Sequence, residues 1–114
     1  MTTNIHINYI EFKANDLEKI KAFYTSVFGW KFTDYGDQYV AFENAGIEGG
    51  FQLTDEAIVN GVLVILRHPN LEEIQSKIEE AGGTISVPIF TFPGGKRFQF
   101  IDPTGNELAV WTEL

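Results

Sequence analysis

Hydrophobic and polar residues alternate along most of the chain, except in two stretches that follow a helical spacing. Residues 5–12 and 61–67 are rich in β-branched and apolar side chains, and each predicts the first strand of a series. Shorter alternating patterns predict further strands over residues 30–34, 38–43, 51–53, 84–87, 96–101 and 106–112. We therefore expect a protein that combines helices with a β-sheet.

The two helical stretches each begin at a capping residue and end at glycine. After Asp16, apolar residues recur at helical spacing until Gly29, which favours the left-handed conformation that ends a helix. A second stretch of this kind runs from Asn70 to the pair Gly82-Gly83. Its glutamates predict an acidic helix face in contact with solvent.

The two halves of the chain share one order of elements: strand, helix, strand, strand, strand. An offset of 54 residues, from Asp16 to Asn70, also pairs the apolar positions of the two helices. Internal duplication is the simplest account, although two unrelated amphipathic helices can also be slid into register. The predicted fold class is α+β in a single domain, residues 1–114, with tandem β-α-β-β-β modules of about 1–57 and 58–114. Helices are expected on the outer face of a cupped mixed sheet.

The strongest local pattern spans residues 96–111, where two alternating strands flank the turn Asp102-Pro103-Thr104-Gly105-Asn106. Each residue of the turn favours a bend through its φ angle or through a bond to its own backbone. One face of the hairpin is predicted to enter the core with Phe98, Phe100, Leu108 and Val110. The other face presents Arg97, Gln99, Glu107, Ala109 and Trp111.

The composition of the chain argues against several classes of binding partner and of chemistry. The chain of 114 residues has 8 basic and 16 acidic residues, a formal net charge of −8 and no cysteine. Nucleic acid and anionic membranes are therefore not expected as partners, and disulfides and cysteine-based chemistry are excluded. The N-terminus lacks a secretory pattern, and no apolar run approaches the roughly 18 residues of a membrane helix, so a cytoplasmic location is expected.

Alternation places aromatic and hydrogen-bonding side chains on the face that the helices leave free. The candidate ligand-binding residues are Tyr9, Tyr39, Gln52, Arg67, Arg97, Gln99 and Trp111. The aromatic rings could stack on a planar ligand while the amides and guanidinium groups hold its polar atoms. Arg97 is the sharpest candidate for an anionic or carbonyl-bearing ligand. Alternatively, the aromatic residues fill the cup or a dimer contact, and Arg97 pairs with a surface acid.

A family resemblance is carried by three segments, residues 15–30, 82–83 and 100–106. Together they resemble the glyoxalase/bleomycin-resistance/extradiol-dioxygenase group, also called the vicinal oxygen chelate superfamily. The resemblance covers nearly the whole chain. It implies the paired modules described above, usually in a homodimer with cups at or near the subunit boundary. Members include lyases, isomerases, dioxygenases and drug-sequestering proteins.

The resemblance also bears on metal binding, because metal-using members place one ligand on each of four strands of the cup. It maps these positions onto Tyr9, Gln52, Leu63 and Ala109. Leucine and alanine carry no donor atom, so a tight divalent metal is not expected. A displaced metal site would have to use Glu11, Glu107, His6 or His68.

The sequence thus predicts a metal-free protein that binds a small aromatic or amphipathic molecule in its cup, in a resistance or sequestration role. The alternative is a related enzyme, a lyase, isomerase or dioxygenase, with a displaced metal site or with acid–base residues such as Glu11, Glu107 or Tyr9. A third alternative is an interaction module whose cup is filled by its own aromatic side chains.

Overall fold

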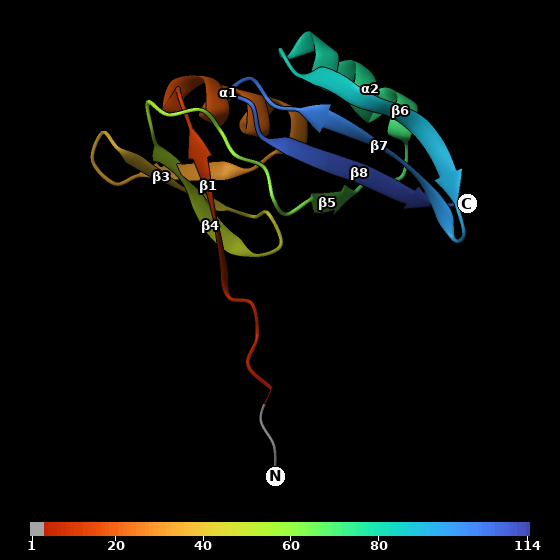
Figure 1. Ribbon diagram of the computed structural model, residues 1–114, viewed down its shortest axis with the longest axis horizontal. Helices are drawn as coiled ribbons and strands as arrows, with labels where there is room; N and C mark the ends of the chain where they lie inside the picture. The colour runs from red at the N-terminus through yellow and green to blue at the C-terminus, as the bar shows by residue number, and fades with distance from the viewer. Residues whose placement is uncertain (1–3) are drawn as a thin grey trace.

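The computed structural model describes residues 4–114, which form two four-stranded sheets and two helices (Figure 1). The first sheet has the order β1-β4-β3-β2. Its strands are β1 (Tyr9–Ala14), β2 (Lys31–Asp34), β3 (Tyr39–Glu43) and β4 (Glu48–Leu53). The second sheet has the order β5-β8-β7-β6. Its strands are β5 (Val64–Arg67), β6 (Thr84–Phe92), β7 (Gly95–Ile101) and β8 (Glu107–Glu113).

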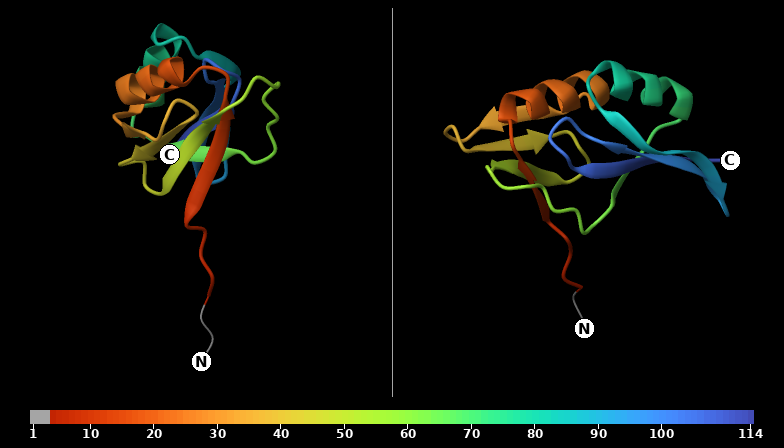
Figure 2. Two further views of the ribbon diagram at one scale, coloured as in Figure 1. Left: turned by 90° about the vertical axis from the view of Figure 1, so that its left-hand side faces the viewer. Right: turned by 45° about the horizontal axis from the view of Figure 1, so that its top comes forward.

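Each sheet is mixed, because its first strand pairs in parallel with its last and the remaining pairs are antiparallel. Helix α1 (Leu17–Phe28) follows β1, and helix α2 (Leu71–Glu80) follows β5. Both helices lie on the same side of the sheets (Figure 2). The predicted α+β fold with two β-α-β-β-β modules is therefore confirmed.

The helix ends follow their local chemistry. The side chains of Asp16 and Asn70 each accept a bond from the backbone N–H three residues on, at 3.0 Å, which confirms both predicted caps. Gly29 ends α1 with φ at 75°. After α2 the left-handed residue is Gly82, with φ at 99°, and not Gly83. The glycines that end the two helices, Gly29 and Gly82, are therefore one residue closer in sequence than the caps Asp16 and Asn70.

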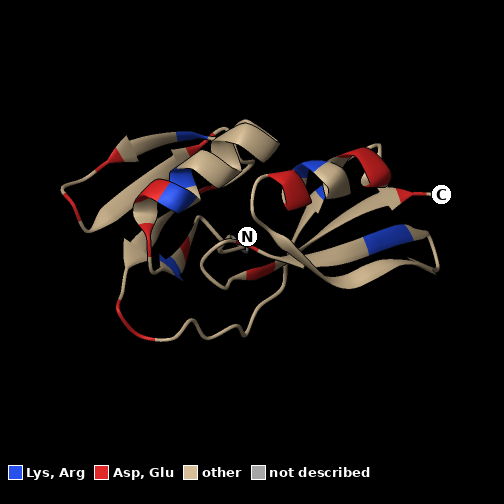
Figure 3. Ribbon diagram, turned by 90° about the horizontal axis from the view of Figure 1, so that it is seen from above, with Lys and Arg blue, Asp and Glu red and all other residues tan. Residues whose placement is uncertain are grey.

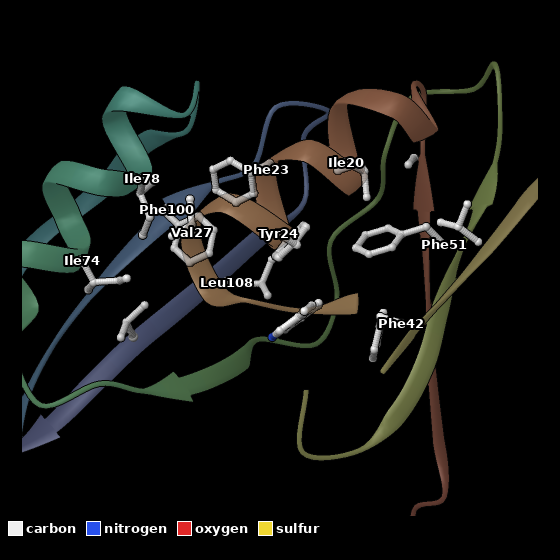
Figure 4. Close-up of a cluster of buried hydrophobic side chains, with 14 of the residues drawn as sticks. Ile20, Phe23, Tyr24, Val27, Phe42, Phe51, Ile74, Ile78, Phe100 and Leu108 are labelled. Carbon is white, nitrogen blue, oxygen red and sulfur yellow. The ribbon is translucent and has the colours of Figure 1, made fainter. Parts of the chain in front are cut away.

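Aromatic side chains join helix α1 to both sheets (Figure 4). Tyr24 of α1 stacks on Trp30 with ring centroids 4.7 Å apart. Phe23, from the same helix, lies 6.0 Å from Phe100 of the second module. The predicted core face of the last hairpin is confirmed, because Phe98, Phe100, Leu108 and Val110 are fully buried. Helix α1 thus contributes to the core of both modules.

Two predicted strands begin later than their sequence patterns indicate. β1 begins at Tyr9 instead of residue 5, and β5 begins at Val64 instead of residue 61. Tyr9 pairs with the first residue of β4, so residues 4–8 have no partner strand within the described part of the chain. This part runs away from both sheets (Figure 1), with Ile5 and Ile7 exposed to 100% and 80%.

Two other strands are longer than predicted. β4 begins at Glu48 instead of residue 51. Gly49 and Gly50 do not form the predicted loop but lie within the strand, where they leave room for side chains of β3. A Cβ atom on Gly50 would lie 2.4 Å from the Tyr39 hydroxyl. β6 continues to Phe92 instead of residue 87, since an edge strand with register shifts tolerates Pro88.

The outer surface of α2 is acidic, as predicted (Figure 3). Its exposed carboxylates belong to Glu72, Glu73, Glu79 and Glu80. Within residues 4–114, neither helix is long and apolar enough to cross a membrane.

Candidate functional site

The predicted ligand-binding residues lie on the faces of the sheets that point away from the core, which we call the free faces. In β7, for example, Arg97 and Gln99 alternate with the buried Phe98 and Phe100 and so point the opposite way. The residues fall into two groups, with Tyr9, Tyr39 and Gln52 on the first sheet and Arg67, Arg97, Gln99 and Trp111 on the second. Across residues 4–114, no hydrogen bond joins one group to the other.

Arg97 is the most constrained member of the second group. Its guanidinium carbon lies 5.2 Å from the centre of the Phe90 ring, within the range of a cation–π contact. Trp111 is its direct neighbour in register on β8. The Arg97 Nε atom is buried and has no hydrogen-bond partner among residues 4–114. A buried unpaired donor is uncommon in a folded protein and marks a position where a bound acceptor would be favourable.

Glu107 orients the polar side chains beside Arg97. Its Oε2 atom accepts bonds from Ser86 Oγ at 2.7 Å and from Gln99 Nε2 at 3.1 Å. Because the Gln99 amide nitrogen faces Glu107, its oxygen faces the Arg97 Nη2 atom, at 3.5 Å. Glu107 therefore fixes which end of the Gln99 amide a ligand on this face would meet.

Arg67 is engaged by a carboxylate of its own sheet. Its Nη2 atom lies 2.8 Å from Glu113 Oε2, and its Nε atom lies 3.3 Å from the other carboxylate oxygen. This bond lowers the pKa of Glu113 and raises the pKa of Arg67. Both side chains are about half exposed, so the pair is weak but still competes with an anionic ligand for Arg67.

The two tyrosines of the first group form a pair. The hydroxyl groups of Tyr9 and Tyr39 are hydrogen-bonded to each other, and loss of water contact raises the pKa of Tyr39 above its ordinary value. Both tyrosines line a hollow of about 350 Å³ on the first sheet together with Tyr35, which was not predicted as a site residue. Gln52 is held separately, since its Nε2 atom donates to the Gln38 carbonyl at 3.2 Å.

Two of the four positions to which the family resemblance assigned metal ligands carry hydrocarbon side chains. Ala109 is fully buried in β8, and its neighbour in β5 is Ile65. Leu63 lies just before β5, although the sequence pattern placed it within that strand. Neither Leu63 nor Ala109 has a donor atom, and within residues 4–114 no cluster of three His, Cys, Asp or Glu side chains could hold a metal.

The side chains proposed for a displaced metal site are dispersed. Glu107 is bonded to Gln99 and Ser86, as described above. The Nδ1 atom of His68 accepts from the Asn70 backbone N–H at 3.0 Å. His6 lies in the chain before β1, outside both sheets.

A larger cavity lies between the two modules and was not predicted from the sequence. It has a volume of about 620 Å³, and its lining includes the predicted ligand-binding residue Arg67 and the metal-site candidate His68. Most of its lining consists of core-type side chains, such as Phe12, Trp30, Phe42, Val64 and Leu66. Local patterns assign these residues to a core, but they do not indicate that the two modules stand apart at this point.

Two β-α-β-β-β modules that share a core and present aromatic and polar side chains on their free faces define a class of paired-module α+β proteins. The chain belongs to the Glyoxalase/Bleomycin resistance protein/Dioxygenase superfamily, whose sequence model matches residues 6–110. The resemblance seen in the sequence is therefore confirmed.

Solved structures of this family share the fold. An enzyme of the family from Burkholderia phytofirmans PsJN is similar with a TM-score of 0.82 at 16% identity, covering 94% of this chain and 98% of that chain. TnmS3, an antibiotic binding protein from Streptomyces sp. CB03234, is similar with a TM-score of 0.73 at 19% identity, covering 100% of both chains. At these identities the similarity shows the fold alone.

A sequence relative is longer than this chain. The protein named "Putative glyoxylase CFP32", from Mycobacterium tuberculosis and Mycobacterium bovis, is 25% identical over 125 residues. The match covers 91% of this chain and 44% of that protein. The chain thus spans less than half the length of these curated relatives.

Proposed function

We propose that the protein binds a small aromatic or amphipathic molecule with an anionic or carbonyl group, and that it does so without a metal. The proposal rests mainly on Arg97, whose buried Nε atom has no partner. An oxygen atom of the ligand would accept from the Arg97 guanidinium after a rotation of the side chain brings its Nε–H group to the surface, and the body of the ligand would lie against Phe90 and Trp111. The antibiotic-binding function in the name of TnmS3 fits a sequestration or resistance role.

The energetics favour such a ligand. A buried donor without a partner costs about 1–3 kcal/mol, and a ligand oxygen at Arg97 would recover much of that cost. The contacts to Phe90 and Gln99 already hold the guanidinium in place, so little side-chain entropy is lost on binding.

The metal-free part of the proposal rests on the donor set. Tyr9 and Gln52 offer a phenol and an amide, and the two other expected ligand positions offer hydrocarbon. Zn²⁺, Ni²⁺, Fe²⁺ and Mn²⁺ require several imidazole or carboxylate donors for tight binding. Stoichiometric metal in protein purified without chelator would overturn this part and favour the enzymatic alternative.

We also infer a homodimer in which the copies meet at the edge strands β1 and β5. β1 and β5 are edge strands, and each has an unpaired side. The chain just before each strand was predicted to extend it and carries exposed apolar side chains: Ile5, Ile7 and Val62. A second copy would give these segments a partner. Sedimentation equilibrium would test this inference, and a monomer at micromolar concentration would contradict it.

Two fluorescent probes test the ligand proposal. 8-Anilinonaphthalene-1-sulfonate combines an aromatic body with an anionic group, and N-phenyl-1-naphthylamine is the same molecule without the sulfonate. Arg97→Gln should weaken binding of the sulfonate by about 10-fold or more, the equivalent of one charge-assisted hydrogen bond. Binding of the uncharged probe should change little.

Arg67→Gln is the matched control, because it removes the same charge from the same face at a residue that Glu113 already engages. We expect it to weaken sulfonate binding by less than about 3-fold. The proposal is wrong if Arg97→Gln binds the sulfonate as tightly as the native protein does, or if the two variants behave alike.

The cytoplasmic location and the exclusion of nucleic acid and membrane as partners remain predictions.

A further inference from the structure

The hollow on the first sheet has an unusual lining for so small a space. Its volume is about 350 Å³, and three of its eight lining residues are tyrosines: Tyr9, Tyr35 and Tyr39. Ala41 also lines it and is too small to fill it. Its polar side chains other than the tyrosines are the carboxylates of Glu43 and Glu48. Aromatic rings and acidic groups therefore surround this space, and among the described residues no basic side chain lines it.

The chain holds this arrangement in place through Gly50. Tyr39 is on β3 and Tyr9 is on β1, with β4 between them. The Tyr39 ring crosses β4 above Gly50, where a Cβ atom would lie 2.4 Å from the hydroxyl oxygen, and reaches the Tyr9 hydroxyl. The pair is thus fixed before any ligand binds. Because burial and this bond raise the pKa of Tyr39, its ring stays an uncharged phenol at neutral pH.

The carboxylates beside the tyrosines have no cationic partner. Glu48 is next to Tyr9 in register, and Glu11 is two residues further along β1. None of Glu11, Glu43 and Glu48 forms an ion pair within the described part of the chain, although Lys31 lies opposite Glu43 on β2. The free face of the first sheet also carries Lys13 and Lys31, but within residues 4–114 the charged side chains that line the hollow itself are carboxylates.

We propose that this hollow binds the ammonium group of a small organic cation, with Tyr9 and Tyr39 as its aromatic walls and Glu48 as its counter-charge. Aromatic faces attract quaternary and primary ammonium groups through the ring quadrupole, and nearby carboxylates add a direct charge interaction. The volume is at the lower end of the range of ligand sites, so the site accommodates a compact head group and not a whole large molecule.

A divalent metal fits the same hollow poorly. Burial raises the pKa of Tyr39, and a phenol that keeps its proton is a weak ligand. The described residues also include no cluster of three His, Cys, Asp or Glu side chains that could hold a metal. An organic ammonium needs no such coordination sphere. The inference adds a ligand class to the proposed function, because Tyr9 and Tyr39 belong to the proposed cup, but the hollow is complete within one chain.

Choline and its uncharged isostere 3,3-dimethylbutan-1-ol test the proposal in titrations followed by NMR of the Ala41 methyl group. Choline should bind about 5-fold or more tightly than the alcohol, which has the same shape and no charge. Glu48→Gln should weaken choline binding by about 3-fold or more. Glu80→Gln, on the outer face of α2, removes the same charge far from the sheet and should change it little.

Two substitutions of Tyr9 distinguish the contribution of its ring from that of its hydroxyl group. Tyr9→Leu should abolish choline binding, whereas Tyr9→Phe keeps the aromatic wall and should retain most of it. Equal affinities for choline and the alcohol, or equal effects of Glu48→Gln and Glu80→Gln, would overturn the proposal. If choline fails while the naphthalene sulfonate still binds, the cation site alone is wrong. If the sulfonate fails while choline binds, the error lies in the role of Arg97.

Discussion

The substitution Tyr24→Phe should destabilise the protein by removing one hydroxyl group that connects the two modules. Tyr24 is fully buried in α1, and its hydroxyl donates to Asp102 Oδ2 at 2.9 Å. The other carboxylate oxygen accepts from the backbone N–H groups of Thr104, Gly105 and Asn106. Phenylalanine keeps the packing but leaves Oδ2 without its donor.

The expected loss is that of a hydrogen bond to a buried charge, about 1.5–3 kcal/mol in the free energy of unfolding near neutral pH. The loss should also depend on pH. Burial raises the pKa of Asp102, and the bond from Tyr24 is one of several that oppose this shift, so the substitution raises the folded-state pKa further. A carboxyl group whose pKa is higher in the folded state than in the unfolded state makes the protein less stable as the pH rises from the unfolded-state pKa to the folded-state pKa. The cost of the substitution should therefore be larger at about pH 7 than at about pH 4.5.

Urea denaturation followed by tryptophan fluorescence measures both effects, at one fixed protein concentration because an oligomer would make the midpoint concentration-dependent. Tyr35→Phe is the matched control, since Tyr35 is 64% exposed and should change the free energy of unfolding by less than about 0.5 kcal/mol. Equal effects of the two substitutions at neutral pH, or a cost of Tyr24→Phe that shrinks as the pH rises, would refute the role assigned to this bond.

Two other substitutions test the packing described above. Asp102→Asn keeps an oxygen for the backbone N–H groups of the turn but cannot ionise. The urea midpoint of this variant should therefore decline less between about pH 4.5 and about pH 7 than the midpoint of the native protein does. An equal decline would contradict the raised pKa of Asp102. Gly50→Ala places a methyl group 2.4 Å from the Tyr39 hydroxyl and should cost about 1–3 kcal/mol in the same assay. Gly61→Ala meets nothing within 4 Å and is its control; similar costs for both would argue against the crossing of β4 by Tyr39.

Local patterns predicted the elements well where the chemistry of a residue acts on its own neighbours. The caps Asp16 and Asn70 bond to backbone N–H groups three residues away, and the alternation in β7 depends only on strand geometry. The patterns failed where a distant segment decides. The glycines of β4 were predicted as a loop, but in the sheet Gly49 leaves room for Phe42 and Gly50 leaves room for Tyr39, both from the neighbouring strand β3. Residues 5–8 alternate like a strand but have no partner strand among residues 4–114.

The candidate site divides in the same way. Sequence assigned Arg97, Gln99 and Trp111 to one face, which follows from alternation. It could not indicate that Arg97 is left with a buried unpaired Nε atom or that Glu107 orients Gln99, because these depend on side chains from three strands. It also missed Tyr35, which lies in a turn and reaches the hollow only in the folded sheet.

The turn at residues 102–106 shows both what the local sequence determines and what it leaves to the tertiary structure. Its sequence by itself determines a bend, because Asp102 bonds the backbone N–H groups of the next few residues wherever the turn is placed. Only the tertiary structure directs the other oxygen of Asp102 to Tyr24, 78 residues away, and Asn106 Nδ2 to the Lys13 carbonyl at 2.7 Å. The physical reason is range: a local pattern encodes conformation and the face of each side chain, whereas packing between distant segments decides which faces meet.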